Sequence, residues 1–509
     1  MNLDAALSIA SGGLANINAQ LVLVSHNVAN ASTPGYQVEN GTQQALSVGG
    51  IGMGVVTGPA TRSVDDELQA DLLRQNATVA ALQTRQSALS AIDTVNGTPG
   101  QGNDLASLLG NLQNQFSTLL NDPGNATQQT QVVATAASLA QGINTLSDTY
   151  TSQRQAAQDA TVSEVAQINK TLGAIGALSD HIIATKVSGQ STADLENQRD
   201  AQVASLSQLV DITTFEQPNG DLLIATGTGT QLPTHGQANP LSTSGANLQP
   251  GAYYPGGGVP PILLGGVDVT AALQGGQIGA NIGLRDRTLP AYQGQLDEFA
   301  RTLAGRFADQ GLTLFTDASG AVPAGGGTPV QAGYVGFADE IQVNPAVQTN
   351  PALVRDGTGA IAGSPTGASA FTPNPAGGPA GFSTLLTRIL NNSFGAQVQT
   401  GVAQPAPNTA GLGPTGTLNA PYAPPATLGS FATALVGSEA ADSADVTGRL
   451  TTEQAVQTSF STRLTSETGV NIDAEMSLMI TLQNAYGANA KVMSAAHAMF
   501  AQLLAAVPT

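Results

Sequence analysis

The stretch LDAALSIASGGLANINAQLVLVSHNV, residues 3–28, places apolar residues at alternating steps of four and three. The same spacing recurs over residues 479–507 at the other end of the chain, with one polar member, Asn489. Such a stripe is typical of the narrow contact line, or seam, of a coiled coil. We therefore expect the two ends to meet, in one molecule or between neighbours, although two ordinary core helices would give the same pattern. The predicted seam residues are Leu7, Leu14, Ile17, Leu21 and Val28 at one end and Leu482, Tyr486, Asn489, Met493, Phe500 and Leu503 at the other.

Composition narrows the classes of function. The 509 residues are enough for about three domains. The net charge of −19, with 16 Lys and Arg against 35 Asp and Glu, argues against sequence-independent contact with nucleic-acid phosphates. The absence of cysteine excludes disulfides and thiolate chemistry. Only 10% of the residues are charged, and the chain is rich in Ala, which suits long, closely packed helices.

The N-terminal residues MNLDAALSIASGG show no basic region followed by an uninterrupted apolar run, so we expect no cleavable signal peptide. The longest apolar runs are predicted to be too short to cross a membrane. Taken alone, these two features would indicate a cytoplasmic protein.

Helical periodicity and turn residues divide the remainder of the chain. Residues 132–182 keep one apolar stripe and predict a helix of some 50 residues, about 75 Å long. Residues 212–226 predict a β-hairpin that turns at Pro218, Asn219 and Gly220. Residues 316–430 lose helical periodicity and are dominated by Gly, Pro, Ala and Thr, which predicts a β-rich insertion with long loops.

These elements predict an elongated, multidomain α+β protein in which N- and C-terminal segments form a long, coiled-coil-like helical bundle and a β-rich domain is inserted. Three nested domains are expected. The first combines 1–45 with 468–509 as the terminal coiled coil. The second combines 46–315 with 430–467 as a long-helix bundle that includes a β-hairpin region at about 211–270. The third is the variable outer insertion, 316–429.

Catalytic chemistry needs convergent titratable groups, and the sequence gives no sign of them. The four histidines are scattered, and none has a possible metal ligand at a spacing of three or four residues. Neither a GxSxG nor an SxxK motif is present. We therefore expect no enzyme activity, no catalytic residue, no cofactor and no metal site. Asn489 in the seam either fixes the register of helix pairing or is tolerated drift in the heptad.

The segment VSHNVANASTPGYQ, residues 24–37, is similar to the signature of the axial proteins of the bacterial flagellum. That signature reads Asn-Asn-Ile/Val-Ala-Asn, a short linker with Thr, and then Gly-Tyr or Gly-Phe. The matching motif residues are Asn27, Ala29, Asn30, Gly35 and Tyr36, whereas His26 stands where the family usually has Asn. Residues 469–504 resemble the family's C-terminal segment over their whole length.

Three inner segments resemble the hook-associated member of this family that joins the hook to the filament. They are DLENQRD at 194–200, PNGDLLI at 218–224 and GGQIGANIGLRD at 275–286. Gln37 and Val38 depart from the Ser-Arg that usually follows the motif tyrosine. The resemblance covers about 1–310 and 430–509, and it does not extend to 316–430.

The resemblance implies a structural subunit that forms a ring of identical copies at the hook–filament junction. Its implied partners are the flagellar hook protein, hook-associated protein three, and the flagellar type III export apparatus with an export chaperone; neither nucleic acid nor membrane is expected. The implied location is extracellular, on the flagellum, after export without a cleaved signal. Two alternatives remain: a hook or distal-rod subunit, and a secreted protein on a flagellar scaffold with a glycan-binding or enzymatic insertion.

Overall fold

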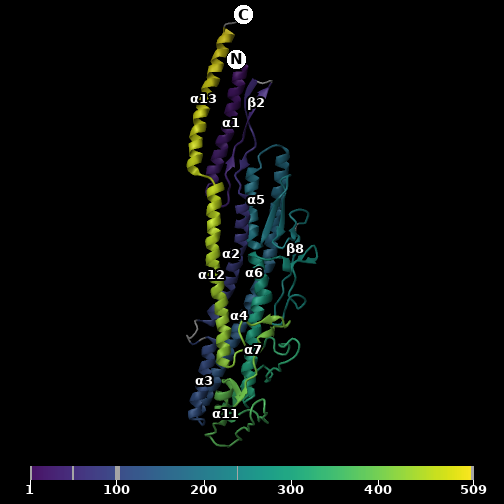
Figure 1. Cartoon of the computed structure of the whole chain (residues 1–509), viewed down its shortest axis with the longest axis vertical. Helices are drawn as coiled ribbons and strands as arrows, with labels where there is room; N and C mark the ends of the chain where they lie inside the picture. Colours follow the sequence, from purple (N-terminus) through teal and green to yellow (C-terminus); the bar gives the residue numbers. More distant parts are fainter. Residues whose placement is uncertain (1–2, 49–50, 98–101, 103, 238, 506–509) are drawn as a thin grey trace.

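The computed structural model describes residues 3–48, 51–97, 102, 104–237 and 239–505. Its long helices run along one axis, and the two ends of the chain lie at the same end of an elongated molecule (Figure 1). Long helices at both termini enclose a middle part that contains small sheets. The predicted α+β class and elongated architecture are therefore confirmed.

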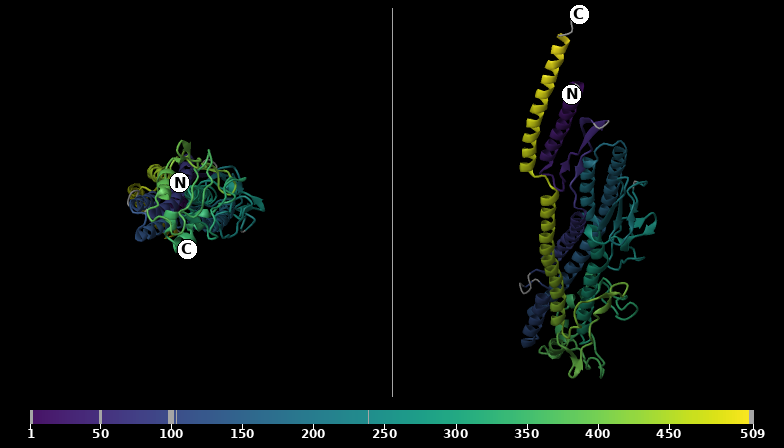
Figure 2. Two further views of the ribbon diagram at one scale, coloured as in Figure 1. Left: turned by 90° about the horizontal axis from the view of Figure 1, so that it is seen from below. Right: turned by 45° about the horizontal axis from the view of Figure 1, so that its top comes forward.

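The terminal unit consists of two helices and a hairpin. Helix α1 (Leu3–Asn30) lies beside α13 (Ile472–Ala505), as both views show (Figures 1 and 2). Strands β2 (Gln43–Val48) and β3 (Ile51–Thr57) form an antiparallel hairpin against α1. The boundary expected after residue 45 falls inside β2, because pairing with β3 holds the whole hairpin on α1.

Below the terminal unit, long helices form the body. Helix α4 has 62 residues and is about 93 Å long, which confirms the continuous helix predicted there. The side chain of Asn125 caps its N-terminus by accepting from the backbone N–H of Gln128. The helices of the body are α2 (Asp66–Asn96), α3 (Leu105–Asn121), α4 (Ala126–Val187), α5 (Ala193–Leu209), α6 (Gly276–Gly283), α7 (Leu289–Ala308) and α12 (Leu428–Thr468).

Small sheets flank the body beside α4 and α5. The predicted hairpin is confirmed: β5 (Ile212–Glu216) pairs antiparallel with β6 (Leu222–Thr226), and β7 (Gln231–Leu232) extends the sheet. Gly220 has a φ of 96° in the turn, a conformation that favours glycine. A second small sheet joins β8 (Leu241–Ser242), β9 (Leu263–Leu264) and β10 (Val267–Asp268), and β1 (Glu39–Asn40) pairs with β4 (Thr61–Arg62) near the terminal unit.

Residues 316–429 contain short ribbons and short helices joined by long loops. Their apolar side chains, including Leu385, Ile389 and Phe394, belong to the same buried cluster as those of α3, α4 and α7. Strands this short cannot bury a core of their own, so the segment packs on the helices. Its elements are β11 (Phe315–Thr316), α8 (Phe337–Glu340), β12 (Gln342–Val343), α9 (Pro345–Thr349), α10 (Leu353–Asp356), α11 (Thr384–Arg388), β13 (Gln397–Gln399), β14 (Val402–Ala403), β15 (Ala410–Leu412) and β16 (Leu418–Asn419).

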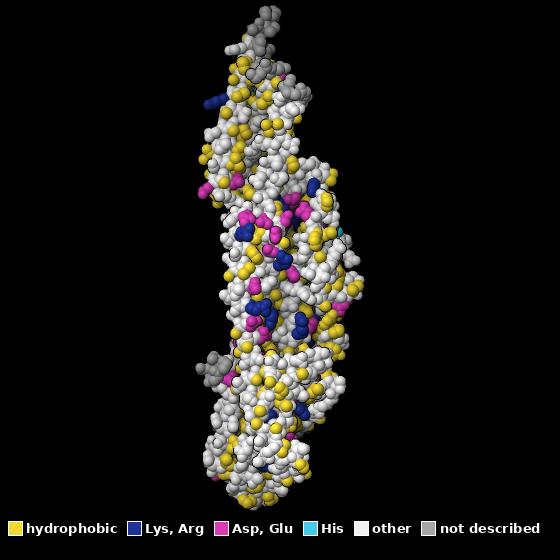
Figure 3. Space-filling model, in the orientation of Figure 1, with side chains coloured by type: hydrophobic (Ala, Val, Ile, Leu, Met, Phe, Trp, Pro, Cys, Tyr) yellow, Lys and Arg dark blue, Asp and Glu magenta, His cyan; other side chains and the backbone are white. Residues whose placement is uncertain are grey.

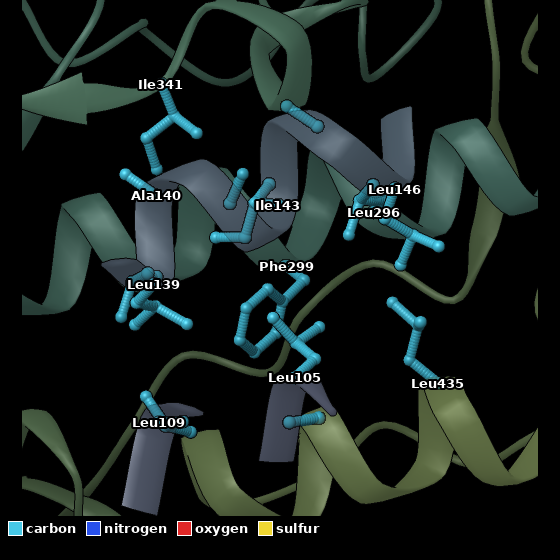
Figure 4. Close-up of a cluster of buried hydrophobic side chains, with 14 of the residues drawn as sticks. Leu105, Leu109, Leu139, Ala140, Ile143, Leu146, Leu296, Phe299, Ile341 and Leu435 are labelled. Carbon is cyan, nitrogen blue, oxygen red and sulfur yellow. The ribbon is translucent and has the colours of Figure 1, made fainter. Parts of the chain in front are cut away.

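The main core lies where four helices meet at the lower end of the body. Ile143 and Leu146 of α4 face Leu296 and Phe299 of α7, with Leu105 of α3 alongside (Figure 4). Aromatic rings extend this core; for example, the ring centres of Phe299 and Phe431 lie 5.4 Å apart. Burial of this cluster fixes the lower helices in one arrangement and leaves the terminal unit to project beyond them.

Within the described residues, one helical stretch, Asp4–Asn30, is long and apolar enough to cross a membrane. This differs from the sequence-based expectation that the apolar runs are too short. Only 22% of the apolar window is buried, and a single such helix is weak evidence for a membrane span. The apolar residues of α1 instead pack against α13 and the β2–β3 hairpin.

Candidate functional site

Part of the predicted seam lies in the interface between α1 and α13. Ile17 and Leu482 are buried there together with Val24, so the ends do pair within one molecule. Tyr486, in contrast, is 42% exposed and points largely away from the interface. The side chain of Leu503 lies outside the described part of the chain. The half-buried seam residues are Leu7, Leu14, Leu21, Val28, Asn489, Met493 and Phe500.

Asn489 lies opposite Gly13 of α1, which has no side chain. A Cβ atom at Gly13 would lie 3.2 Å from Oδ1 of Asn489, tighter than ordinary van der Waals contact. The Nδ2 group of Asn489 donates to the backbone oxygen of Ala485 in its own helix at 3.1 Å. The side-chain amide of Asn489 therefore finds a hydrogen-bond partner in its own helix. Its contact with α1 is close packing against Gly13.

The terminal unit exposes apolar side chains around α13 and α1, which together we call the outer face. It combines residues of α13 with Val22 of α1, which is 70% exposed. Charged side chains gather on the middle of the body, while apolar side chains spread over the terminal helices (Figure 3). Exposed apolar groups in such number mark an interaction surface. The outer-face residues of α13 are Ile472, Met476, Leu478, Ile480, Tyr486, Val492 and Met499, each at least 42% exposed.

Asn27, the first motif residue, joins three elements at the base of the terminal unit. It is 1% exposed. Its Nδ2 donates to the backbone oxygen of Glu39 at 2.9 Å and to Oε1 of Glu475 at 3.3 Å. Its Oδ1 accepts from the backbone N–H of Glu39 at 3.1 Å and from the Tyr36 hydroxyl at 3.0 Å. One amide thus connects α1, β1 and α13.

The remaining motif residues shape the turn that follows α1. Asn30 donates to the backbone oxygen of His26 at 3.1 Å and accepts from the Thr33 hydroxyl at 3.4 Å. Gly35 has a φ of 77°, which explains why a glycine occupies this position. Ala29 is exposed on α1. The turn directs the chain from the terminal helix toward the body.

His26 lies between two carboxylates from different parts of the protein. Its Nδ1 is 3.8 Å from Glu39 of β1, and its Nε2 is 3.7 Å from Asp194 of α5. The hydroxyl of Tyr36 is 3.2 Å from Nδ1. His26, Glu39 and Asp194 could each offer one metal ligand atom, and these three atoms lie within 4.8 Å of one another. The two carboxylates approach different ring nitrogens at distances beyond hydrogen-bond range, so His26 contacts β1 and α5 electrostatically only.

The motif turn docks on the first turns of α5. Asn197 accepts from the backbone N–H of Gln37 at 3.3 Å and donates to its backbone oxygen at 3.1 Å. Arg62 of β4 donates from Nε to Glu196 at 2.9 Å and from Nη1 to Asp200 at 2.6 Å. These contacts join two sequence motifs that lie about 160 residues apart. Asp194 and Asp200 belong to the quoted DLENQRD pattern, but nothing in the sequence pairs that pattern with residues 26–39.

Burial shapes the electrostatics of this junction. It raises the pKa of Glu39 and of Glu475 above their ordinary values, although hydrogen bonds to each carboxyl oppose the effect. Burial, reinforced by Glu39, also raises the pKa of the Tyr36 hydroxyl, which therefore stays protonated and remains a donor. The junction is a hydrogen-bonded joint between terminal unit and body. Of its members, the motif residues and Asn197 lie in segments that carry the family resemblance, whereas Glu39 and Arg62 lie outside those segments and no sequence signal points to them.

Comparison with known proteins agrees with this arrangement. Residues 89–321 match the family described as the flagellar hook-associated protein FlgK helical domain. By this match, the segment is identified as a flagellar hook-associated helical domain. Residues 465–506, which include α13, match the C-terminal family of the flagellar basal body rod FlgEFG proteins. The hook-associated identity thus lies in the body, and the wider axial signature lies in the terminal unit.

The similarity to individual family members is partial. Flagellar hook-associated protein 1 of Bacillus subtilis is 26% identical over 237 residues, covering 44% of this chain and 46% of that protein. The protein of the same name from Salmonella typhimurium is 27% identical over 251 residues, covering 47% and 44%. The alignments thus span less than half the length of these relatives. The flagellar hook junction protein FlgK of Burkholderia pseudomallei superposes with a TM-score of 0.40 at 23% identity, covering 50% of this chain and 46% of that one.

Proposed function

We propose that this protein is a structural subunit of the bacterial flagellum that forms a ring of identical copies at the hook–filament junction and adapts the hook to the filament. The observation that carries the proposal is the combination of two segments in one chain: a hook-associated helical body and a terminal pair with an exposed apolar face. The proposed partners are further copies of the chain, the flagellar hook protein and hook-associated protein three.

The exposed apolar area supports self-association through the terminal unit. Ile480 and Val492 of α13 are 57% and 51% exposed, and each exposes apolar surface that gains free energy on burial. A ring would bury these side chains against neighbouring copies. The predicted seam residues then act at two levels: Ile17 and Leu482 hold α1 to α13, while Tyr486 serves contacts between subunits.

We assign parts of the chain to parts of the ring along the predicted domains, with one change at the β2–β3 hairpin. We assign the inner wall of the ring to the terminal helices together with the β2–β3 hairpin. The long-helix body forms the wall outside it, and residues 316–429 face outward from the lower end. The joint around Asn27 and His26 sets the angle between the first two parts. A structural rather than catalytic role is proposed for the whole chain.

The protein is further proposed to be exported unfolded through the flagellar type III apparatus with the help of a chaperone. The chain would then fold outside the cell. An absence of cysteine and a low charge density suit a chain that must be threaded through a narrow channel. The extracellular location on the flagellum follows from this route.

Two substitutions on neighbouring positions of α13 test the assembly role. Leu482→Asp places a charge in the buried cluster with Ile17, whereas Ile480→Asp alters only the outer face. We expect Leu482→Asp to lose the α1–α13 pairing, and Ile480→Asp to keep the monomer's helicity and unfolding temperature. Both variants should fail to form filaments. Val267→Asp, at a site that is 67% exposed on the flanking sheet, is the matched control and should assemble normally.

The readout separates the proposed role from its alternatives. Cells that carry Ile480→Asp are examined by electron microscopy, and the medium is probed for shed filament protein. Bare hooks with shed filament protein support the junction role. Missing hooks would instead indicate a rod or hook subunit. Normal filaments would show that the outer face does not mediate assembly.

A further inference from the structure

A cavity of about 360 Å³ lies far from the terminal unit, between α7 and two loops of the 316–429 segment. Arg301, Thr302 and Arg306 of α7 line one side, and residues 322–325 and 404–408 close the other. A volume of this size is in the range of small-molecule sites. Its lining also holds buried polar atoms without partners, which is the feature that calls for a ligand.

Arg306 is a buried cation that forms no ion pair with any residue that the structure describes. It is 4% exposed, and both of its recorded hydrogen bonds use Nη1, to the backbone oxygens of Gly395 at 3.3 Å and Ala426 at 3.1 Å. Its Nε has no partner among the described residues. Burial lowers the pKa of Arg306 to about 10, so the guanidinium remains charged at neutral pH. A buried charge without a counter-charge is costly, and an anion in the cavity would remove that cost.

Two further groups of the lining are incompletely satisfied. The Nε of Arg301 has no described partner, and its guanidinium carbon lies 5.1 Å from the ring centre of Tyr334. Gln404 is 9% exposed, donates to the backbone oxygen of Asn392 at 2.6 Å, and leaves Oε1 without a donor. The cavity therefore offers positive donors together with one acceptor.

The buried carboxylate of Glu298 already has hydrogen-bond partners within the protein. Glu298 lines the cavity, but its oxygens accept from the hydroxyl of Tyr334 and from both the backbone N–H of Asn408, at 2.8 Å, and its Nδ2, at 3.2 Å. It forms no recorded ion pair with Arg306 within the described residues. Asp309 also lines the cavity, at its exposed rim, where its charge interacts with Arg301 but makes no ion pair with Arg306 within the described residues.

We propose that this cavity binds a small organic anion, a carboxylate or phosphate that also carries a hydroxyl group. Arg306 and Arg301 would bind the anionic group, since guanidinium groups match carboxylate and phosphate geometry. Gln404 would accept from the hydroxyl, and Pro323, Pro405 and Pro407 would pack against the carbon skeleton. The site gives the outer segment a ligand-binding role that is independent of assembly through α13.

The test uses the full chain and three probes: glucuronate, inorganic phosphate and neutral glucose. Binding is measured by calorimetry and by the rise in unfolding temperature. We expect both anions to bind and to raise the unfolding temperature, with little effect from glucose. Arg306→Gln should weaken anion binding by about tenfold or more. Arg449→Gln, at an exposed position of α12, should leave binding unchanged.

Because Arg306→Gln alone could disturb folding, Ala406→Glu provides a second variant. Ala406 lines the cavity from an exposed loop position, so a glutamate there supplies an internal carboxylate without changing the core. It should block added anions while keeping or raising the unfolding temperature. Equal binding of glucose and glucuronate, or anion binding that survives both substitutions, would overturn the proposal.

Discussion

The side-chain amide of Asn27 on α1 donates to Oε1 of Glu475 on α13 at 3.3 Å, across a separation of 448 residues. The same amide exchanges two hydrogen bonds with the backbone of Glu39. Both ends of the chain are thereby fixed to the strand that leads into the body. A single buried side chain thus holds together the base of the terminal unit, which is the region proposed for ring assembly.

Asn27→Ala should destabilise the terminal unit by about 1–3 kcal/mol, because it leaves buried donors and acceptors without partners. Hydrogen exchange should become faster in α1, β1 and the first turns of α13, while α4 keeps its protection. Asn18→Ala, at an exposed position of α1, is the matched control and should change neither. Unchanged exchange in Asn27→Ala would show that the amide does not hold the joint.

Gly13→Val should separate α1 from α13, because a Cβ there already lies 3.2 Å from Oδ1 of Asn489. The expected cost is about 1–3 kcal/mol of overpacking in urea unfolding. Adding Asn489→Ala should recover part of that loss by making room. Gly487→Ala on α13, where a Cβ meets nothing within 4 Å, should instead stabilise by about 0.5–1 kcal/mol. Independent, additive effects of Gly13→Val and Asn489→Ala would argue against the contact.

Arg62→Met should weaken the docking of the terminal unit on α5. The side chain is 5% exposed and pairs with Glu196 and Asp200, which would be left as partly buried, unpaired carboxylates. Breaking a buried pair in this way costs about 3–5 kcal/mol. The measurement is chemical unfolding, and Asp200→Asn in the same chain should restore part of the loss. Arg74→Met, at a site that is 66% exposed, should have little effect.

Glu164 should make stability depend on pH. Burial raises its pKa to about 7 from an ordinary 4.5; Oε1 accepts from Asn281 at 2.7 Å, and Oε2 has no described partner. The folded protein therefore holds this proton more tightly than the unfolded chain. Its stabilising contribution is present below pH 4.5 and is lost as pH rises through 7, with a limit of about 3 kcal/mol.

Glu164→Gln removes that titration. The variant should match the parent protein near pH 5 and exceed it in stability at pH 8, as measured by urea unfolding at both values. The exposed Asp4→Asn serves as the control and should leave the pH profile unchanged. A variant that is less stable than the parent at pH 8 would contradict the assigned environment.

Periodicity in the sequence predicted the local elements and indicated that the two ends meet, in one molecule or between neighbours. Heptad spacing predicted α1 and α13, the unbroken stripe over 132–182 predicted α4, and Pro218 to Gly220 predicted the hairpin. These features are set by periodicity and by turn residues, which act over a few neighbouring positions. The family motif likewise singled out Asn27 and Gly35, which supply a buried amide in α1 and a positive φ in the turn after it.

Which side chains of those elements meet depends on the packing of distant elements. That packing buried Leu482 while leaving Tyr486 largely exposed, although both fit one heptad, because α13 meets α1 along one side only. It also brought His26, Glu39 and Asp194 together and placed Arg306 at a cavity, without an ion pair to any described residue. Such contacts depend on the path of the chain between distant elements, and no periodicity in the sequence encodes that path.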